Sequence, residues 1–138
     1  MTLTTKRLVG RAKADMRHLS PAEVEAHLLA RDATVVDVRE SEELDAQGWI
    51  ADAIHVPRGL LEFRADPSSP LHRPELDRER SIIVYDAAGD RAALAGETLT
   101  LLGYRDVAYL AGGLAAWTCA GLPVVGLKGW HNLGRNGR

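Results

Sequence analysis

Four short runs of β-branched and other apolar residues recur along this chain, each separated from the next by a segment of helical or turn character. The runs lie at residues 34–38, 53–56, 81–85 and 107–110. Strands that are joined by helices do not form tight hairpins, and they pair in parallel through right-handed crossovers. The pattern therefore predicts an α/β domain built on a mostly parallel sheet.

The intervening helices carry recognisable start signals. Ser20 is placed to cap a helix in which Pro21 takes the first position and Glu23 completes a capping box. This helix is expected to run to about residue 30. Apolar residues at helical spacing predict a second helix over residues 91–102, and a third is expected over residues 114–119.

Size and cysteine content limit the class of protein. A chain of 138 residues with 46% hydrophobic residues suits one globular domain. Cys119 is its only cysteine, which excludes an internal disulfide and a multi-cysteine zinc site, and the histidines show no ligand spacing. We therefore expect no metal and no cofactor. One free cysteine fits a reducing, cytoplasmic location.

No stretch approaches the roughly 18 apolar residues that a membrane span requires, and the N-terminus lacks the apolar core of a secretory signal. We therefore expect no membrane association.

Charge is distributed unevenly along the chain. Residues 1–17 carry a net charge of +4 and residues 126–138 one of +3, which leaves −9 on residues 18–125 of a chain whose total is −2. An acidic body argues against nucleic acid as a partner. We expect a basic, helical N-terminal extension at residues 1–16, a domain at 17–125 and an irregular basic tail at 126–138. The basic ends either dock on the acidic body or bind another molecule.

The segment after the third strand is the expected functional loop, since sites in open α/β sheets lie at the carboxyl ends of strands. Its small residues allow successive backbone N–H groups to turn inward and bind an anion beside a helix N-terminus. The loop comprises Asp86, Ala87, Ala88, Gly89, Asp90, Arg91 and Ala92.

Four blocks of sequence, in order, resemble the rhodanese-homology family of sulfurtransferases. They are DVRE at 37–40, GWIADAIHVP at 48–57, IIVY with the following loop from 82, and GGLAAW with AGLPV from 112 to 124. The match covers about residues 17–125. The resemblance implies a three-layer α/β domain with a central, mostly parallel five-stranded sheet flanked by helices.

The resemblance also implies a catalytic cysteine at the first loop position, where active members hold sulfur as a persulfide. Here that position is Asp86, whereas Gly89 and Arg91 match the family pattern. A carboxylate oxygen is a poor sulfur acceptor. We expect the Asp86 carboxylate to fold into the loop, accept its N–H groups and act as a built-in anion. The chain is then a binding or regulatory module without sulfurtransferase activity, and its partner is a protein or a small anionic ligand.

Further polar residues are expected at the rim of the pocket: Asp37, Arg39 and Arg58. The arginines either offer positive potential to a ligand or pair with nearby acids. The expected pairs are Arg39 with Asp37, Arg58 with Glu62 and Arg91 with Asp90.

Two alternatives to the non-catalytic module remain open. In the first alternative, the chain is an active sulfurtransferase of the family that uses another thiol, either that of Cys119 or that of a partner. In the second, it carries out phosphoryl chemistry on Asp86, with Mg²⁺ held by Asp37. A cysteine phosphatase of related fold is disfavoured, because the Asp-x4-Arg loop is one residue too short and lacks the nucleophile. A homodimer is possible, and the sequence does not decide it.

Overall fold

A computed structural model of the protein describes residues 2–127. The strands are β1 (Arg17–Leu19), β2 (Ala33–Asp37), β3 (Ile54–His55), β4 (Ser81–Tyr85) and β5 (Val107–Leu110). The helices are α1 (Thr5–Asp15), α2 (Pro21–Ala30), α3 (Ser41–Gln47), α4 (Leu61–Ala65), α5 (Asp90–Leu101) and α6 (Gly113–Cys119), with a 3₁₀ turn at Arg58–Leu60. No helix within these residues is long and apolar enough to cross a membrane.

The five strands form one sheet in the order β1-β5-β4-β2-β3, and every pairing is parallel. The predicted fold class is thereby confirmed. Strand β1 was not expected as a separate element, because its three residues include no β-branched residue and only Leu19 is buried. It forms because Arg17–Leu19 lies in register with residues 108–110 of β5.

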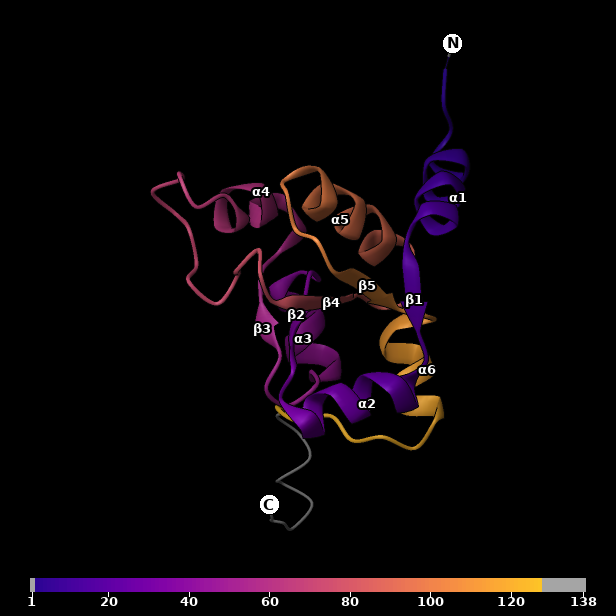
Figure 1. The fold of residues 1–138 in the computed structure, drawn as a ribbon. Coiled ribbons are helices and arrows are strands. Elements are labelled where there is room, and N and C mark those ends of the chain that lie inside the picture. Colours follow the sequence, from indigo (N-terminus) through magenta and orange to yellow (C-terminus); the bar gives the residue numbers. More distant parts are fainter. Residues whose placement is uncertain (1, 128–138) are drawn as a thin grey trace.

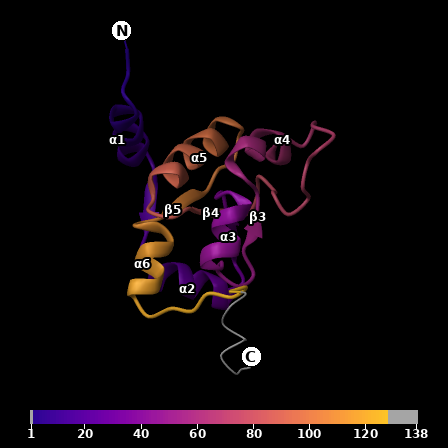
Figure 2. The ribbon, with the colours of Figure 1, turned by 180° about the vertical axis from the view of Figure 1, so that it is seen from behind.

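Helices cover both faces of the sheet, as Figures 1 and 2 show from opposite sides. Helices α1, α4 and α5 lie on one face, over a core that includes Val36, Val84 and Leu99. Helices α2, α3 and α6 lie on the other, over a core that includes Val35 and Ile83. Neighbouring residues of β2 and β4 therefore point into opposite cores, which explains the unbroken apolar runs at residues 35–36 of β2 and 82–85 of β4.

Helix α1 forms within the segment that was expected to be a helical extension. Its Ala12 side chain is fully buried and belongs to the same core as α5. Met16, just after the helix, reaches Gly96 of α5, where even a methyl group would lie 2.8 Å from the Met16 Cε. Lys13 adds an ion pair to Asp90 at 2.7 Å. The basic N-terminal segment thus docks on the acidic body. Most of the expected C-terminal tail lies outside the described residues.

The long segment between β3 and β4 is held by a buried tyrosine. The Tyr104 hydroxyl lies 2.8 Å from the Ala65 carbonyl oxygen and 2.9 Å from that of Leu76, and it donates to this pair of acceptors. Leu61, Ala65 and Leu76 are fully buried, so the segment is anchored despite its many prolines.

We expect Tyr104→Phe to lower the free energy of unfolding by about 1 kcal/mol, because two buried carbonyls lose their donor while the apolar packing is kept. Urea denaturation measures the change. Tyr109→Phe is the matched control, since Tyr109 is also buried but its hydroxyl makes no hydrogen bond within residues 2–127. An equal loss in both variants would contradict the anchoring role.

Candidate functional site

The site lies where β2 and β4 end side by side. Asp37 of β2 is in register with Tyr85 of β4, and the Val38 N–H donates to the Tyr85 carbonyl at 3.1 Å. The loop of residues 86–89 begins directly after Tyr85 and leads into α5. This is the carboxyl edge of a parallel sheet, where the sequence predicted the functional loop.

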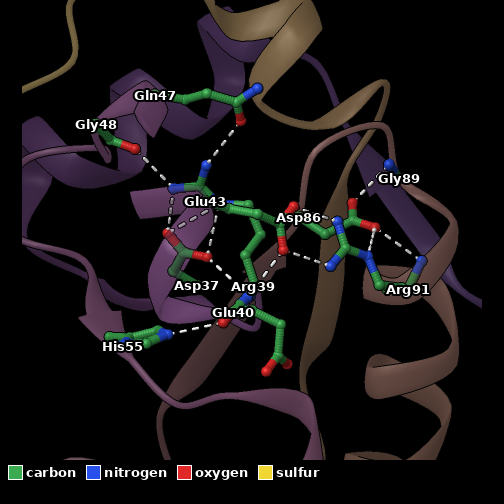
Figure 3. A network of polar contacts seen from close by, with 10 residues as sticks. All are labelled: Asp37, Arg39, Glu40, Glu43, Gln47, Gly48, His55, Asp86, Gly89 and Arg91. Atoms are coloured by element: carbon green, nitrogen blue, oxygen red, sulfur yellow. Dashed lines mark hydrogen bonds and ion pairs between the residues drawn. The ribbon is translucent and has the colours of Figure 1, made fainter. Parts of the chain in front are cut away.

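The Asp86 side chain turns into this loop and is 2% exposed. Its Oδ1 accepts the Gly89 N–H at 2.5 Å and its Oδ2 accepts the Arg91 N–H at 2.8 Å (Figure 3). The Arg91 Nε lies 3.5 Å from Oδ2. The expectation that the carboxylate folds into the loop and accepts its N–H groups is confirmed. The negative charge therefore sits against N–H donors at the start of α5.

The start of α6 holds the other side of the loop. The N–H groups of Leu114 and Ala115 donate to the carbonyls of Asp86 and Ala87, at 2.8 and 3.0 Å. This close approach requires Gly113, which has φ +61° and where a Cβ would lie 2.6 Å from the Ala87 backbone. Because the loop carbonyls are engaged by α6, the first loop peptides have a fixed orientation.

The Arg91 side chain pairs with Glu43 of α3 rather than with Asp90, so that expected pairing is wrong. Its two terminal nitrogens each lie 2.8 Å from a different Glu43 carboxylate oxygen. Asp90 pairs with Lys13 instead. A residue that opens a helix points away from its neighbour one position on, and the true partner comes from 48 residues earlier in the chain.

Glu43 was not singled out from the sequence. It also accepts the Glu40 N–H at 2.9 Å, closing a capping box on α3. The Arg91 guanidinium, together with the Glu40 N–H, lowers the pKa of Glu43 to about 2. The only signal for it in the sequence is a glutamate three residues after a helix cap, and such a signal indicates a helix start rather than a site.

Asp37 and Arg39 form the expected ion pair, but the pair is buried, so the expectation that both residues lie at a pocket rim is wrong. Their side chains are 1% and 0% exposed. The Arg39 guanidinium donates to both Asp37 carboxylate oxygens, at 3.0 Å and 2.7 Å, and to the Gly48 carbonyl at 2.7 Å (Figure 3). The His55 Nε2 lies 2.7 Å from the Arg39 carbonyl. The pair ties the end of β2 to the segment that follows α3.

The Arg58 side chain is half-buried, and its guanidinium is already engaged in hydrogen bonds. It donates to Glu62, the expected partner, at 3.0 Å and to the Thr98 hydroxyl at 3.0 Å. Thr98 lies two turns into α5, so Arg58 braces that helix rather than the loop at its start.

Within residues 2–127, no group of three or more histidine, cysteine or acidic side chains is arranged to hold a metal ion. Asp37, which the phosphoryl-transfer alternative requires as a ligand, is instead engaged by Arg39.

The Glu43–Arg91 pair predicts a specific acid sensitivity. Since the folded pKa of about 2 lies below the ordinary 4.5, the stabilisation is complete above pH 4.5 and is lost as the pH falls to 2. Glu43→Gln should lower the free energy of unfolding at pH 7 and flatten its decline between pH 4.5 and 2. Glu42→Gln is the control, because Glu42 has no partner within residues 2–127. Urea titrations at several pH values test this, and parallel curves for the native chain and Glu43→Gln would contradict it.

Comparison with known proteins agrees with this architecture. The rhodanese-like domain model matches residues 20–120. A sulfurtransferase from Allochromatium vinosum is 35% identical over 98 residues, which cover 71% of this chain and 83% of that protein. A tRNA uridine(34) hydroxylase from Streptococcus pneumoniae is 31% identical over 100 residues, 72% of this chain but only 30% of the relative.

Solved structures show the same relationship. The polysulfide-sulfur transferase homodimer of Wolinella succinogenes has a TM-score of 0.71 at 37% identity, covering 87% of this chain and 85% of that one. A protein of unknown function from Rhodopseudomonas palustris, described as a possible tyrosine phosphatase, has a TM-score of 0.85 at 33% identity and covers 91% and 96% of the two chains. The fold, the loop and these similarities together show that the chain belongs to the rhodanese-like domain family.

Proposed function

We propose that this chain is a non-catalytic rhodanese-like module that binds a partner protein and does not itself transfer sulfur. The observation that carries the proposal is the Asp86 carboxylate, which occupies the position of the family's cysteine and accepts two loop N–H groups. Sulfur transfer needs a thiolate that attacks a sulfane sulfur and holds it as a persulfide. A carboxylate supplies neither the nucleophilicity nor a stable sulfur adduct.

The same geometry disfavours a small anionic ligand at this loop. The N–H groups of Gly89 and Arg91 are engaged by Asp86, and the Arg91 guanidinium is engaged by Glu43. An entering anion would have to displace two carboxylates and would meet their negative charge. Of the two partner classes that the sequence left open, a protein is therefore the better supported.

The alternative of an active enzyme with another thiol rests on the similarity to a sulfurtransferase and on the exposed Cys119. The position of Cys119 weighs against it. The first turn of α6 contacts the loop, whereas Cys119 is the last residue of that helix, about 9 Å further along its axis at 1.5 Å per residue.

We place the module in the cytoplasm, because a single free thiol fits a reducing compartment.

A thiosulfate–cyanide assay tests the missing nucleophile. We expect no turnover by the native chain or by Cys119→Ser. In Asp86→Cys combined with Cys119→Ser, the introduced thiolate should take the outer sulfur of thiosulfate with release of sulfite. The resulting persulfide is detected by mass spectrometry. Turnover by Cys119→Ser with Asp86 intact would overturn the proposal.

Anion binding tests the built-in charge independently. Titration of the native chain with sulfate should leave the amide NMR signals of Gly89 and Arg91 unchanged. Asp86→Ser removes the internal carboxylate and frees both N–H groups, so saturable shifts are expected at these amides. Asp90→Ser is the control, because Asp90 lies in the same loop but pairs with Lys13. Sulfate binding at the loop of the native chain would contradict the built-in anion.

A further inference from the structure

A groove of about 600 Å³ opens at the amino ends of β1 and β5, away from the functional loop. Asp15 and Met16 at the end of α1 form one wall, and Glu97 and Leu101 of α5 form the other. Leu101 is 85% exposed although it is a large apolar residue. Arg17, Arg105 and Asp106 also line the groove, and Arg17 pairs with Asp106 at 3.0 Å. The groove therefore offers apolar surface among charges of both signs, and neither Asp15 nor Glu97 has an ion-pair partner within residues 2–127.

Helix α1 presents a complementary surface beside this groove. It lies at the edge of the molecule, and residues 2–4 before it project beyond the body (Figures 1 and 2). Leu8, Arg11 and Asp15 follow each other at spacings of three and four, so they share one side of the helix. Because Asp15 lines the groove, this side faces it.

The residues on this side of α1 lack partners in a single copy. Leu8 is 41% exposed, and the Arg11 side chain makes no ion pair within residues 2–127. In one isolated copy, Leu8 is thus exposed, and the Arg11 guanidinium and the carboxylates of Asp15 and Glu97 have no ion-pair partner within residues 2–127. These four residues form a continuous strip of surface.

We propose that this strip is the contact between two copies of the chain, which pair α1 against α1 in antiparallel orientation about a two-fold axis. Antiparallel pairing brings Arg11 of each copy beside Asp15 of the other, and two-fold symmetry makes that contact occur twice. Leu8 of each copy then extends toward the partner's groove and covers its exposed Leu101.

A second copy fits the strip better than an unrelated partner, because the chain itself supplies both halves of the contact. Arg11 and Asp15 lie on one short stretch of helix, so a self-complementary pairing satisfies both of them at once. A nucleic acid or an acidic membrane would use Arg11 and Arg105 but would leave the carboxylates of Asp15 and Glu97 opposed by negative charge.

Sedimentation equilibrium of the full chain tests the pairing. The native chain is expected to dimerise. Arg11→Glu and Asp15→Arg should each weaken the dimer by at least about tenfold, because each places like charges opposite one another at two positions. Arg31→Glu, at the C-cap of α2 on the opposite face of the sheet, is the matched control and should dimerise like the native chain. Circular dichroism checks that every variant is folded.

Mixing the two variants gives the decisive result. An Arg11→Glu chain and an Asp15→Arg chain restore opposite charges at both positions of the two-fold contact. The mixture should therefore form a one-to-one heterodimer that is tighter than the homodimer of either variant alone. Contacts within one chain cannot produce this rescue. A native chain that stays monomeric up to millimolar concentration, a dimer that neither variant weakens, or a mixture that stays monomeric would overturn the proposal.

Discussion

The buried ion pair between Asp37 and Arg39 is the interaction on which the site depends. Both side chains are removed from water, and the guanidinium reaches across to the Gly48 carbonyl. Loss of one partner would leave an uncompensated buried charge, at a cost of about 3–5 kcal/mol. The pair closes the turn from β2 through α3, and α3 carries the Glu43 that orients Arg91. A structural ion pair under the loop thus determines how the loop's own arginine is held.

The loop after β4 binds a carboxylate of its own, that of Asp86. In an active member of the family the cradle of N–H groups would stabilise a thiolate or persulfide, whereas here a carboxylate from the first loop residue fills it. The cradle has kept the architecture that stabilises negative charge, including Gly113 and the bonds from α6 to the loop carbonyls. What changed is the chemical nature of the charge. The loop architecture therefore does not require the family's cysteine, because the same N–H groups are satisfied by a carboxylate.

Two negative side chains with different tasks meet at Arg91. Asp86 takes the backbone N–H, and Glu43 takes the ends of the guanidinium. The Arg91 side chain therefore extends from α5 to α3. Its ion pair with Glu43 joins two helices that belong to different crossovers. On the other side of α5, Lys13 of α1 reaches Asp90. The start of α5 and the loop before it are consequently held by contacts from α1, α3 and α6 together.

Local sequence determined most of the fold. Strand β4 spans Ser81–Tyr85 as predicted, and α2 runs from Pro21 to Ala30 behind its Ser20 cap, because β-branched runs and capping boxes act through neighbouring residues. The inward turn of Asp86 was also predictable, since a short acidic side chain at the first loop position lies within reach of the N–H groups three and five residues on. Tertiary structure alone decided three other features: the strand at Arg17–Leu19, the burial of Asp37 with Arg39, and the choice of Glu43 as the partner of Arg91. The strand and the Glu43 pairing depend on distant segments being brought together, and the pattern along one segment carries no information about which distant side chain will face it. The pairing of Asp37 with its near neighbour Arg39 was expected, but its burial depends on contacts of Arg39 with Gly48 and Tyr85.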